Sequence, residues 1–540
     1  MHGFQRRVLE VAVAVAALAI AGCGGGGGST SSTGTPAQAA ASQLATGVIT
    51  GFGSVYVDGV KLDDSAVGAV AEQADGSTKP AVLQLGQRLR ATHDGSGKAS
   101  RLVVDAAVIG RVSAVDAVQG TLQVAGQLVR VNADPATGVV TQFGGYDSTA
   151  AGRYSALADV QAGDLAEVHG SPLLQGGQWA VQATRIDKRS SITAVRVAGV
   201  VSGLVNTTDT RTFALGALTV DFAAALAAGK VTAVERLADG VAVRVFGDAA
   251  GVVNGKLTAA SVRIGGDREG LEPSTRLQLG GVVSARDAGA GTFQLEGTTI
   301  RVGTASIEPL GATIVDGSWV KVDGSVGLDG SIDATRVAVR QNNVAADLAR
   351  VRLIGPITGY QDANTFIVRD VPVDASGVAA ADRTACTALA DGVQINVAAV
   401  MQAGTDVVFA EELKCEAPPA GRPLADHAAG AIAAIDAATN TLSLTDRDGQ
   451  TRVVRWTDAT AFVGRDLVAA SSLVLGARVQ AEGVLDGTAL VAKVISQDGA
   501  RPVDRFRERP PQAPGQQADR VEAQQNWSSY RSMQRPAPRR

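Results

Sequence analysis

The chain has 540 residues, of which 19% are charged, and a formal net charge of −4 at pH 7. Soluble domains average about 25% charged residues, and the arginines and aspartates of this chain are scattered without forming a basic stretch in its repeats. Because nucleic-acid binding needs clustered positive charge, the composition argues against nucleic acid as a partner.

Residues 1–22 have the features of an export signal. Arg6 and Arg7 precede a run of thirteen residues from Val8 to Ile20 that is apolar except for Glu10, which is the order found in secretory signals. The run ends in Ile-Ala-Gly-Cys at residues 20–23, which resembles a bacterial lipobox, whose cysteine is lipidated and becomes the mature N-terminus. A transmembrane anchor is the alternative, but it needs about 20 apolar residues. We therefore expect lipidation at Cys23.

Residues 23–45 are expected to be a flexible tether. Five glycines follow Cys23, and they are followed by a Ser/Thr/Pro/Ala-rich stretch without an apolar pattern. Such a composition is typical of a flexible linker that spans a distance without a fixed structure. The residue directly after Cys23 is Gly24 and not the aspartate of retained lipoproteins. In this respect the chain resembles lipoproteins that are sent to the outer membrane. Because no later run reaches about 18 apolar residues, the lipid is the expected contact with the membrane. We therefore expect an outer-membrane lipoprotein of the cell envelope, facing the periplasm or the exterior.

Residues 277–341 contain one complete unit of a repeated pattern. Alternating apolar residues separated by short Gly-containing turns predict strands at 292–295, 298–302, 319–322 and 332–339, after an opening strand that contains Gly281. A connection at 303–317 separates the third strand from the fourth, where an OB-type barrel has its helix or long loop. This unit is therefore predicted to be a small antiparallel barrel of about five strands.

The pattern recurs along the chain, at 46–107, 108–188, 197–265, 277–341, 350–415 and 427–497. Within the second copy, residues 163–170 are expected before the fourth strand and 178–186 as the fifth strand. The repeat is longer than a propeller blade of about 40 to 50 residues. The predicted fold is all-β: a tandem array of about six small OB-like β-barrels of five to six strands, which contact their neighbours.

Aromatic residues are few, at 4% of the chain. Phe293, Phe366 and Trp319 fall on strand positions expected in the barrel cores. The row of exposed rings with which OB-type proteins bind sugars or single strands is missing from the pattern. The strand glycines Gly199 and Gly281 are expected to allow the coiling that a small barrel requires.

Apart from Cys23, the cysteines are Cys386 and Cys415 in the fifth copy. Two cysteines in one small exported domain favour a disulfide. The strands around them are expected to form an antiparallel hairpin with its turn near residues 403–404, which places the start of one strand beside the end of the other. A metal site is the alternative, but His427 is the only nearby histidine and no Cys-x-x-Cys occurs. We predict a Cys386–Cys415 disulfide and no metal site.

Catalytic chemistry is not expected. Besides His2 in the signal, the histidines are His93, His169 and His427, each in a different copy, and no catalytic or phosphate-binding motif occurs. Residues 51–55 resemble a dinucleotide loop, but they lack its third glycine and lead into a strand, so a hairpin is expected. We therefore predict no catalytic residues, no cofactor and no enzymatic activity.

Two acidic clusters resemble calcium ligands. They are residues 446–449 (Asp-Arg-Asp-Gly) and the set Asp323, Asp329 and Asp333. Neither has the EF-hand spacing or its closing glutamate. Asp-Gly is also a common hairpin turn, so we expect these aspartates to form turns.

Residues 498–540 differ in composition from the repeats. They contain nine arginines, five acidic residues and several prolines and glutamines. Such a segment is predicted to be a disordered basic tail.

Two sequence features recur in one known family: the opening segment 46–60, TGVITGFGSVYVDGV, and a repeated Leu-x-x-Gly-x-x-Val-x-Val pattern, as in LADGVQINV at 389–397. Together with the lipobox and tether, they resemble a bacterial lipoprotein family built of repeated small β-barrel domains. This family is known only as a domain of unknown function. The resemblance implies exported barrels and transfers no catalytic or binding residue. We expect a structural or interaction scaffold with a protein partner. A binding module for envelope glycan or another extended polymer is the alternative.

Overall fold

The computed structural model describes residues 42–134, 139–145, 153–264, 271–340, 350–357, 360–369, 371–386, 389–390, 393–401, 407–415, 425–445, 451–463, 467, 469–486 and 488–497. The expected lipid site Cys23, most of the tether, the turn near 403–404, residues 446–449 and the tail from 498 lie outside the described residues.

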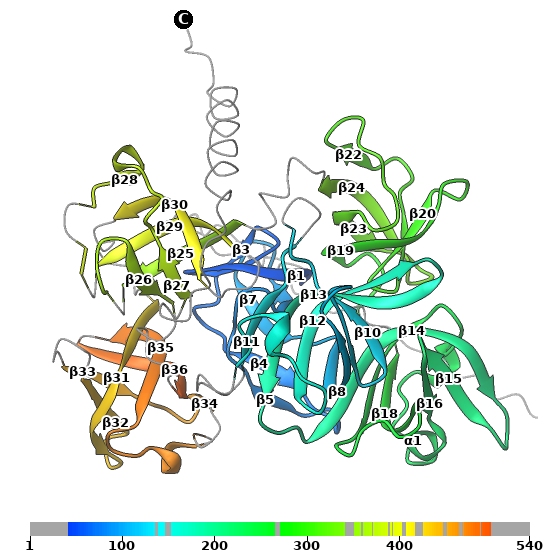
Figure 1. Cartoon of the computed structure of the whole chain (residues 1–540), viewed down its shortest axis with the longest axis horizontal. Coiled ribbons are helices and arrows are strands. Elements are labelled where there is room, and N and C mark those ends of the chain that lie inside the picture. Colours follow the sequence, from blue (N-terminus) through cyan, green and yellow to red (C-terminus); the bar gives the residue numbers. More distant parts are fainter. Residues whose placement is uncertain are drawn as a thin grey trace, which may run out of the picture. The chain divides into compact units, whose positions relative to one another are not determined.

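The first barrel consists of β1 (Gln43–Phe52), β2 (Val55–Val57), β3 (Val60–Leu62), β4 (Ala69–Glu72), β5 (Thr78–Pro80), β6 (Arg88–His93) and β7 (Ala99–Val104) (Figure 1). β1 pairs antiparallel with β2 and β6, β2 pairs with β3, and β6 pairs with β7. β4 continues the third strand after β3 and pairs in parallel with β7, which closes the barrel. The third strand therefore lies beside the fifth, as in the five-stranded Greek-key barrel of the OB type.

Barrels 2 and 3 have the same strand order. Barrel 2 consists of β8 (Val108–Asp116), β9 (Thr121–Val124), β10 (Gln127–Arg130), β11 (Gln142–Gly145), β12 (Leu165–Gln175) and β13 (Gln178–Arg189). Barrel 3 consists of β14 (Ala194–Asn206), β15 (Arg211–Leu215), β16 (Leu218–Asp221), β17 (Ala242–Asp248) and β18 (Lys256–Ile264). In both, the third strand pairs in parallel with the fifth.

Barrels 4 to 6 repeat this order. Barrel 4 consists of β19 (Arg276–Asp287), β20 (Thr292–Leu295), β21 (Thr298–Arg301), β22 (Ser306–Glu308), β23 (Trp319–Val326) and β24 (Ile332–Arg340). Barrel 5 consists of β25 (Arg350–Pro356), β26 (Thr365–Val368), β27 (Val371–Asp374), β28 (Arg383–Thr384), β29 (Gln394–Met401) and β30 (Val408–Cys415). Barrel 6 consists of β31 (Ala425–Asp436), β32 (Thr441–Thr445), β33 (Thr451–Arg455), β34 (Ala461–Val463), β35 (Arg478–Asp486) and β36 (Ala489–Gln497). The described residues thus confirm an all-β fold of small five-stranded closed barrels.

Short helices lie between the third and fourth strands, where the sequence predicted a helix or long loop. They are α1 (Ala223–Ala227) and the 3-10 turns Leu157–Asp159, Val234–Arg236, Ala380–Asp382 and Ala470–Ser472. Within the described ranges, no helix has the length and apolar content to cross a bilayer.

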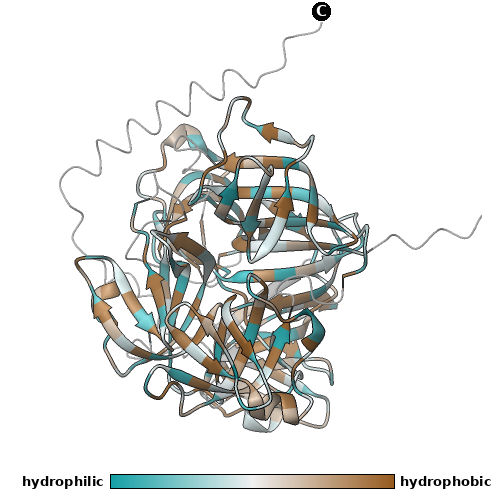
Figure 2. Cartoon of the chain, turned by 90° about the vertical axis from the view of Figure 1, so that its right-hand side faces the viewer, coloured by the Kyte–Doolittle hydropathy of each residue, from teal (hydrophilic) through white to brown (hydrophobic). Residues whose placement is uncertain are grey.

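Hydrophobic and hydrophilic residues alternate along many strands (Figure 2), and in β23 buried residues alternate with less buried ones from Val320 to Val326. Phe293 is 1% exposed and Phe366 is 0% exposed, and both lie in barrel cores as predicted. Trp319 is also buried, but it packs against Val48 and Leu173 of barrels 1 and 2, outside the core of its own barrel. The predicted hairpin at residues 51–55 also forms between β1 and β2, where Gly53 has a φ of +108°. The absence of a side chain at Gly281 leaves room for Glu296, because a Cβ at Gly281 would lie 2.4 Å from Glu296 Oε1.

The prediction for the fourth strand of barrel 2 was wrong at its start. Residues 165–170 belong to β12 and pair with both β8 and β13. This pairing includes Ala166, Val168 and the backbone of Gly170. The side chains of Ala166 and Val168 are fully buried. The segment contains Glu167 and His169, whose polar character concealed its strand pattern in the sequence.

Several barrels are joined by strand pairing. β1 pairs in parallel with β19 of barrel 4 at Leu44–Thr46 and with β25 of barrel 5 at Gly51–Phe52. β8 of barrel 2 pairs with β14 of barrel 3. Barrels 2 and 3 share one apolar core cluster, and barrels 1 and 5 share another. The neighbour contacts expected for such small units are therefore extensive.

Candidate functional site

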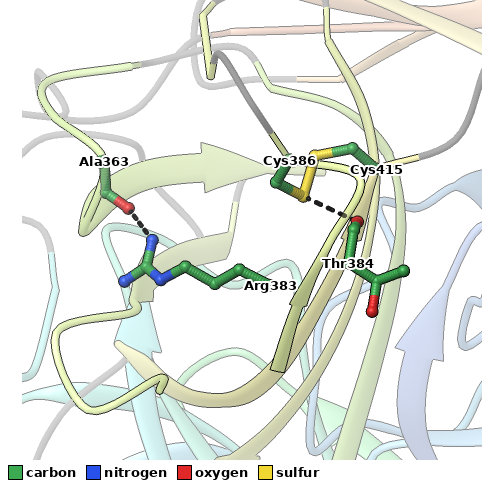
Figure 3. Close-up of a disulfide and its surroundings, with 5 residues drawn as sticks. All are labelled: Ala363, Arg383, Thr384, Cys386 and Cys415. Atoms are coloured by element: carbon green, nitrogen blue, oxygen red, sulfur yellow. Dashed lines mark hydrogen bonds between the residues drawn. A yellow bond between two sulfur atoms is a disulfide. The ribbon is translucent and has the colours of Figure 1, made fainter. Parts of the chain in front are cut away.

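Cys386 and Cys415 form a disulfide, with their Cα atoms 5.0 Å apart (Figure 3). This separation lies within the range of roughly 4.4 to 6.8 Å that disulfides require. β29 and β30 pair antiparallel as predicted, and Ile395 near the start of β29 lies opposite Cys415 at the end of β30. The sequence did not predict β28, which pairs in parallel with β30 and directly precedes Cys386.

Arg383 holds this part of barrel 5 in place. Its Nη1 donates a hydrogen bond to Ala363 O at 2.8 Å (Figure 3), and its Nη2 donates to Asn364 Oδ1 and Ala375 O, each at 2.7 Å. One guanidinium group therefore connects the segment before Cys386 to the loop between the first two strands.

The acidic set of barrel 4 forms turns and ion pairs. Asp329 Oδ1 accepts hydrogen bonds from Ser331 N at 3.0 Å and Ser331 Oγ at 2.7 Å, as expected for a turn. Arg301 forms ion pairs with Asp329 and Asp333, and Asp323 pairs with Arg336. Among the described residues, no group of three or more His, Cys, Asp or Glu side chains is arranged to hold a metal ion.

His169 is fully buried between barrels 1 and 2. Its Nδ1 accepts a hydrogen bond from Arg88 N at 3.4 Å, and its Nε2 lies 3.0 Å from Glu167 Oε1, so the proton belongs on Nε2. Burial raises the pKa of Glu167, but Arg189 and the His169 hydrogen bond outweigh burial and hold this pKa below its usual value. The arrangement orients a structural histidine and gives it no access to a substrate.

Arg88 lies where barrels 1, 2 and 4 meet. Its Nη1 donates hydrogen bonds to Ser171 Oγ at 3.0 Å and Gly280 O at 3.2 Å, and it lies 3.2 Å from Glu296 Oε1. A single buried guanidinium of barrel 1 thus binds barrel 2 and barrel 4 together.

Barrels 1 and 3 meet through a second charged cluster. Asp105, between β7 and β8, pairs with Arg196 and lies 3.8 Å from Arg244 Nη1. Glu72 pairs with Arg263 at 2.8 Å and lies 3.7 Å from Arg244 Nε. A cavity of about 60 Å³ at this junction is lined by charged residues of both clusters, including Arg88, Asp105, Arg244 and Glu296, and is large enough for a few water molecules.

A cleft of about 510 Å³ lies between barrels 2 and 4. We name it the β10 cleft after the strand whose end lines it. Barrel 2 contributes the end of β10, the loop between its first two strands and the loop between its last two, and barrel 4 contributes residues around the start of β23. The lining side chains include Gln119, Arg130, Asn132, Leu173, Gln182, Val282 and Trp319.

The position of the β10 cleft corresponds to the ligand face of the OB barrel. OB-type proteins bind their ligands over the second and third strands and the loops that follow the first and fourth strands. The cleft's volume also lies in the range of about 300 to 1,000 Å³ typical of ligand pockets. It is therefore the candidate ligand site of this protein.

Sequence reasoning missed the charged junctions and the cleft. Arg88, Arg196 and Arg244 occupy strand positions that face outward from their own barrel, and such positions are normally expected to contact water. A weak signal was present, because each of these arginines is directly followed by an apolar residue in its strand.

Comparisons with known proteins agree with the repeat analysis. Residues 109–187, 280–338 and 429–496 match the family model "Domain of unknown function (DUF5666)". These segments are barrels 2, 4 and 6, so the chain contains this domain as a repeat. Among solved structures, a chain titled "drosophila Unr CSD456" matches with 12% identity and a TM-score of 0.13, over 41% of this chain and 96% of that chain. No curated protein matches.

Proposed function

We propose that the protein is an envelope scaffold, in which OB-type barrels are exported, anchored by lipid at Cys23 and held in fixed positions relative to one another. The observation that carries this proposal is the use of β1 by three barrels at once, since it pairs with β19 and β25 in addition to its own barrel. A string of independent modules has no need for shared strands.

Buried charges support the same role. Arg88 connects barrels 1, 2 and 4, and Asp105 and Glu72 connect barrel 1 to barrel 3. Buried ion pairs contribute little net stability compared with apolar packing, but breaking one of them is costly. They therefore favour one arrangement of the barrels over alternatives, which is the property that a scaffold needs.

Spin-label distances test the fixed arrangement. Labels at Val118→Cys in barrel 2 and Leu328→Cys in barrel 4 replace side chains that are 92% and 95% exposed, in a full chain that also carries Cys23→Ala. A single narrow distance distribution is expected. A distribution as broad as that of two tethered but independent domains would overturn the scaffold proposal.

The anchor is tested separately. The export signal and lipobox predict that the wild-type protein fractionates with outer membranes and that Cys23→Ala is released. Membrane association of Cys23→Ala equal to that of the wild type would remove the lipid from the proposal and leave the barrel arrangement unaffected.

A further inference from the structure

The arginine that lines the β10 cleft has counterparts in the two other barrels that match the same family model. Arg130, Arg301 and Arg455 each end the third strand of their barrel, and each lies opposite the threonine that begins the second strand: Thr121, Thr292 and Thr441. The three arginines are therefore equivalent positions of one repeated domain.

The counterparts are paired with carboxylates of their own barrel. Arg301 pairs with Asp329 and Asp333, and Arg455 Nη2 lies 2.6 Å from Asp486 Oδ2. These aspartates come from the end of the fourth strand, the turn after it or the fifth strand. The equivalent stretch of barrel 2, residues 171–184, contains no Asp or Glu.

Within the part of the chain that the structure describes, Arg130 accordingly forms no ion pair with a carboxylate. The residue that pairs with it on the fifth strand is Gln182, where barrel 4 has Asp333 beside Arg301. Arg130 Nε is buried and has no hydrogen-bond partner among the described residues. A partly buried guanidinium without a counter-charge is unfavourable, and a carboxylate is the group that best matches its planar set of donors.

We infer that the β10 cleft binds a carboxylate-bearing oligosaccharide, whose acid group takes the place beside Arg130 that an aspartate fills in barrels 4 and 6. The amide side chains of Gln119 and Gln182 can bond sugar hydroxyls. Leu173, Val282 and Trp319 also line the cleft and offer apolar walls for sugar rings. This role goes beyond that of a scaffold.

Other acidic polymers fit less well. β10 pairs with β9 on one side and with β13 on the other, so a peptide cannot add to it as a further strand. A single-stranded nucleic acid needs a positive groove with exposed rings, whereas this cleft combines Arg130 with Asp316 and a largely buried tryptophan.

The test measures binding of the full chain to a panel of acidic tetrasaccharides by calorimetry. The panel contains oligomers of galacturonate, mannuronate, guluronate and the glucuronate–N-acetylglucosamine repeat, and glycan strands that carry muramic acid. Methyl esters of the same uronates remove the charge and keep the sugar. We expect at least one acidic oligomer to bind and its ester to bind roughly tenfold more weakly or worse.

Two variants and one matched control test whether the acidic oligomer binds beside Arg130. Arg130→Gln removes the charge, and Gln182→Asp gives Arg130 the internal carboxylate that barrel 4 has. Each is expected to weaken binding of the acidic oligomer roughly tenfold or more. Arg301→Gln changes the equivalent arginine of barrel 4 and is expected to bind as the wild type does.

Three results would overturn the inference. They are no binding of any acidic oligosaccharide by the folded chain, binding that Arg130→Gln and Gln182→Asp leave unchanged, and equal binding of a tetraglutamate peptide or a single-stranded hexanucleotide. Circular dichroism of each variant establishes that a loss of binding does not reflect unfolding.

Discussion

Arg88 of barrel 1 and Glu296 of barrel 4 form an ion pair at 3.2 Å although their side chains are only 4% and 10% exposed. The two residues are more than 200 positions apart in the chain. Because a buried charge that loses its partner remains desolvated, this pair makes the contact between barrels sensitive to substitution on either side.

We predict that Glu296→Gln destabilises the contact between barrels 1 and 4. The substitution keeps the shape of the side chain and removes the negative charge that lies 3.2 Å from the buried Arg88 guanidinium, which costs about 3 kcal/mol. Denaturant unfolding measures the loss. The matched control is Glu308→Gln in the same barrel, where the ion pair with Arg336 is exposed and little change is expected. Equal unfolding curves for Glu296→Gln and the wild type would contradict the prediction.

Gly280 of barrel 4 lies directly against Asp58 of barrel 1. A Cβ at Gly280 would be 1.6 Å from Asp58 Oδ2, so Gly280→Ala must displace the carboxylate or separate the barrels. We expect a loss of about 1 to 3 kcal/mol. Gly68→Ala is the control, because a Cβ there meets nothing within 4 Å. Thermal unfolding of both variants checks the difference.

A double variant identifies the cause. Asp58 has a φ of +45°, which glycine adopts easily, so Asp58→Gly removes the obstructing side chain without backbone strain. The loss caused by Gly280→Ala should then shrink in the Asp58→Gly background. Simple additivity of the two changes would show that the clash is not responsible.

Local sequence pattern predicted the barrels because each is built from nearby residues. Strands such as Thr292–Leu295 and Thr298–Arg301 alternate apolar and polar residues and are joined by a Glu-Gly turn, so both strands and register follow from one short segment. Phe293 and Phe366 were assigned to the core for the same reason, since inward positions recur every second residue.

The inter-barrel contacts could not be predicted in this way. Asp105 and Arg196 are 91 residues apart, and nothing local to either one distinguishes a buried partner from solvent. The importance of Arg130 appears only after its strand register is aligned with that of Arg301, which requires the pairing of third and fifth strands. The β28 segment that brings Cys386 to Cys415 was missed because two residues are too few for a pattern.

Removing the disulfide is predicted to destabilise barrel 5. Cys386 and Cys415 are 29 residues apart, and closing a loop of that size contributes about 3 to 4 kcal/mol in the chain-entropy model. The Cys386→Ala/Cys415→Ala double variant should therefore unfold at lower denaturant concentration. In the exported wild type, mass analysis after alkylation without reduction should find neither thiol labelled. Labelling of both would contradict the bridge in the exported protein.

We predict that Asp64 makes the contact between barrels 1 and 6 dependent on pH. Burial and the nearby Glu482 raise the pKa of Asp64 to about 6. Lys493 of barrel 6 donates a hydrogen bond to Asp64 O at 2.8 Å. Burial lowers the pKa of Lys493, although the nearby carboxylates oppose this effect. A carboxyl group whose pKa is raised by a contact favours that contact when it is protonated.

The sign of the effect follows from the raised pKa of Asp64. The stabilisation of the contact by protonated Asp64 is complete below the free pKa of the carboxyl group, about 4. This stabilisation is lost as the pH rises through about 6, so the contact should be stronger at pH 4.5 than at pH 7.5. The difference is on the order of 1–2 kcal/mol. Hydrogen exchange of barrel 6 peptides, corrected for the intrinsic pH dependence of exchange, measures the strength of the contact. Asp64→Asn cannot ionise and should show the stronger protection at both pH values. Equal pH dependence in Asp64→Asn and the wild type would assign the effect to another group.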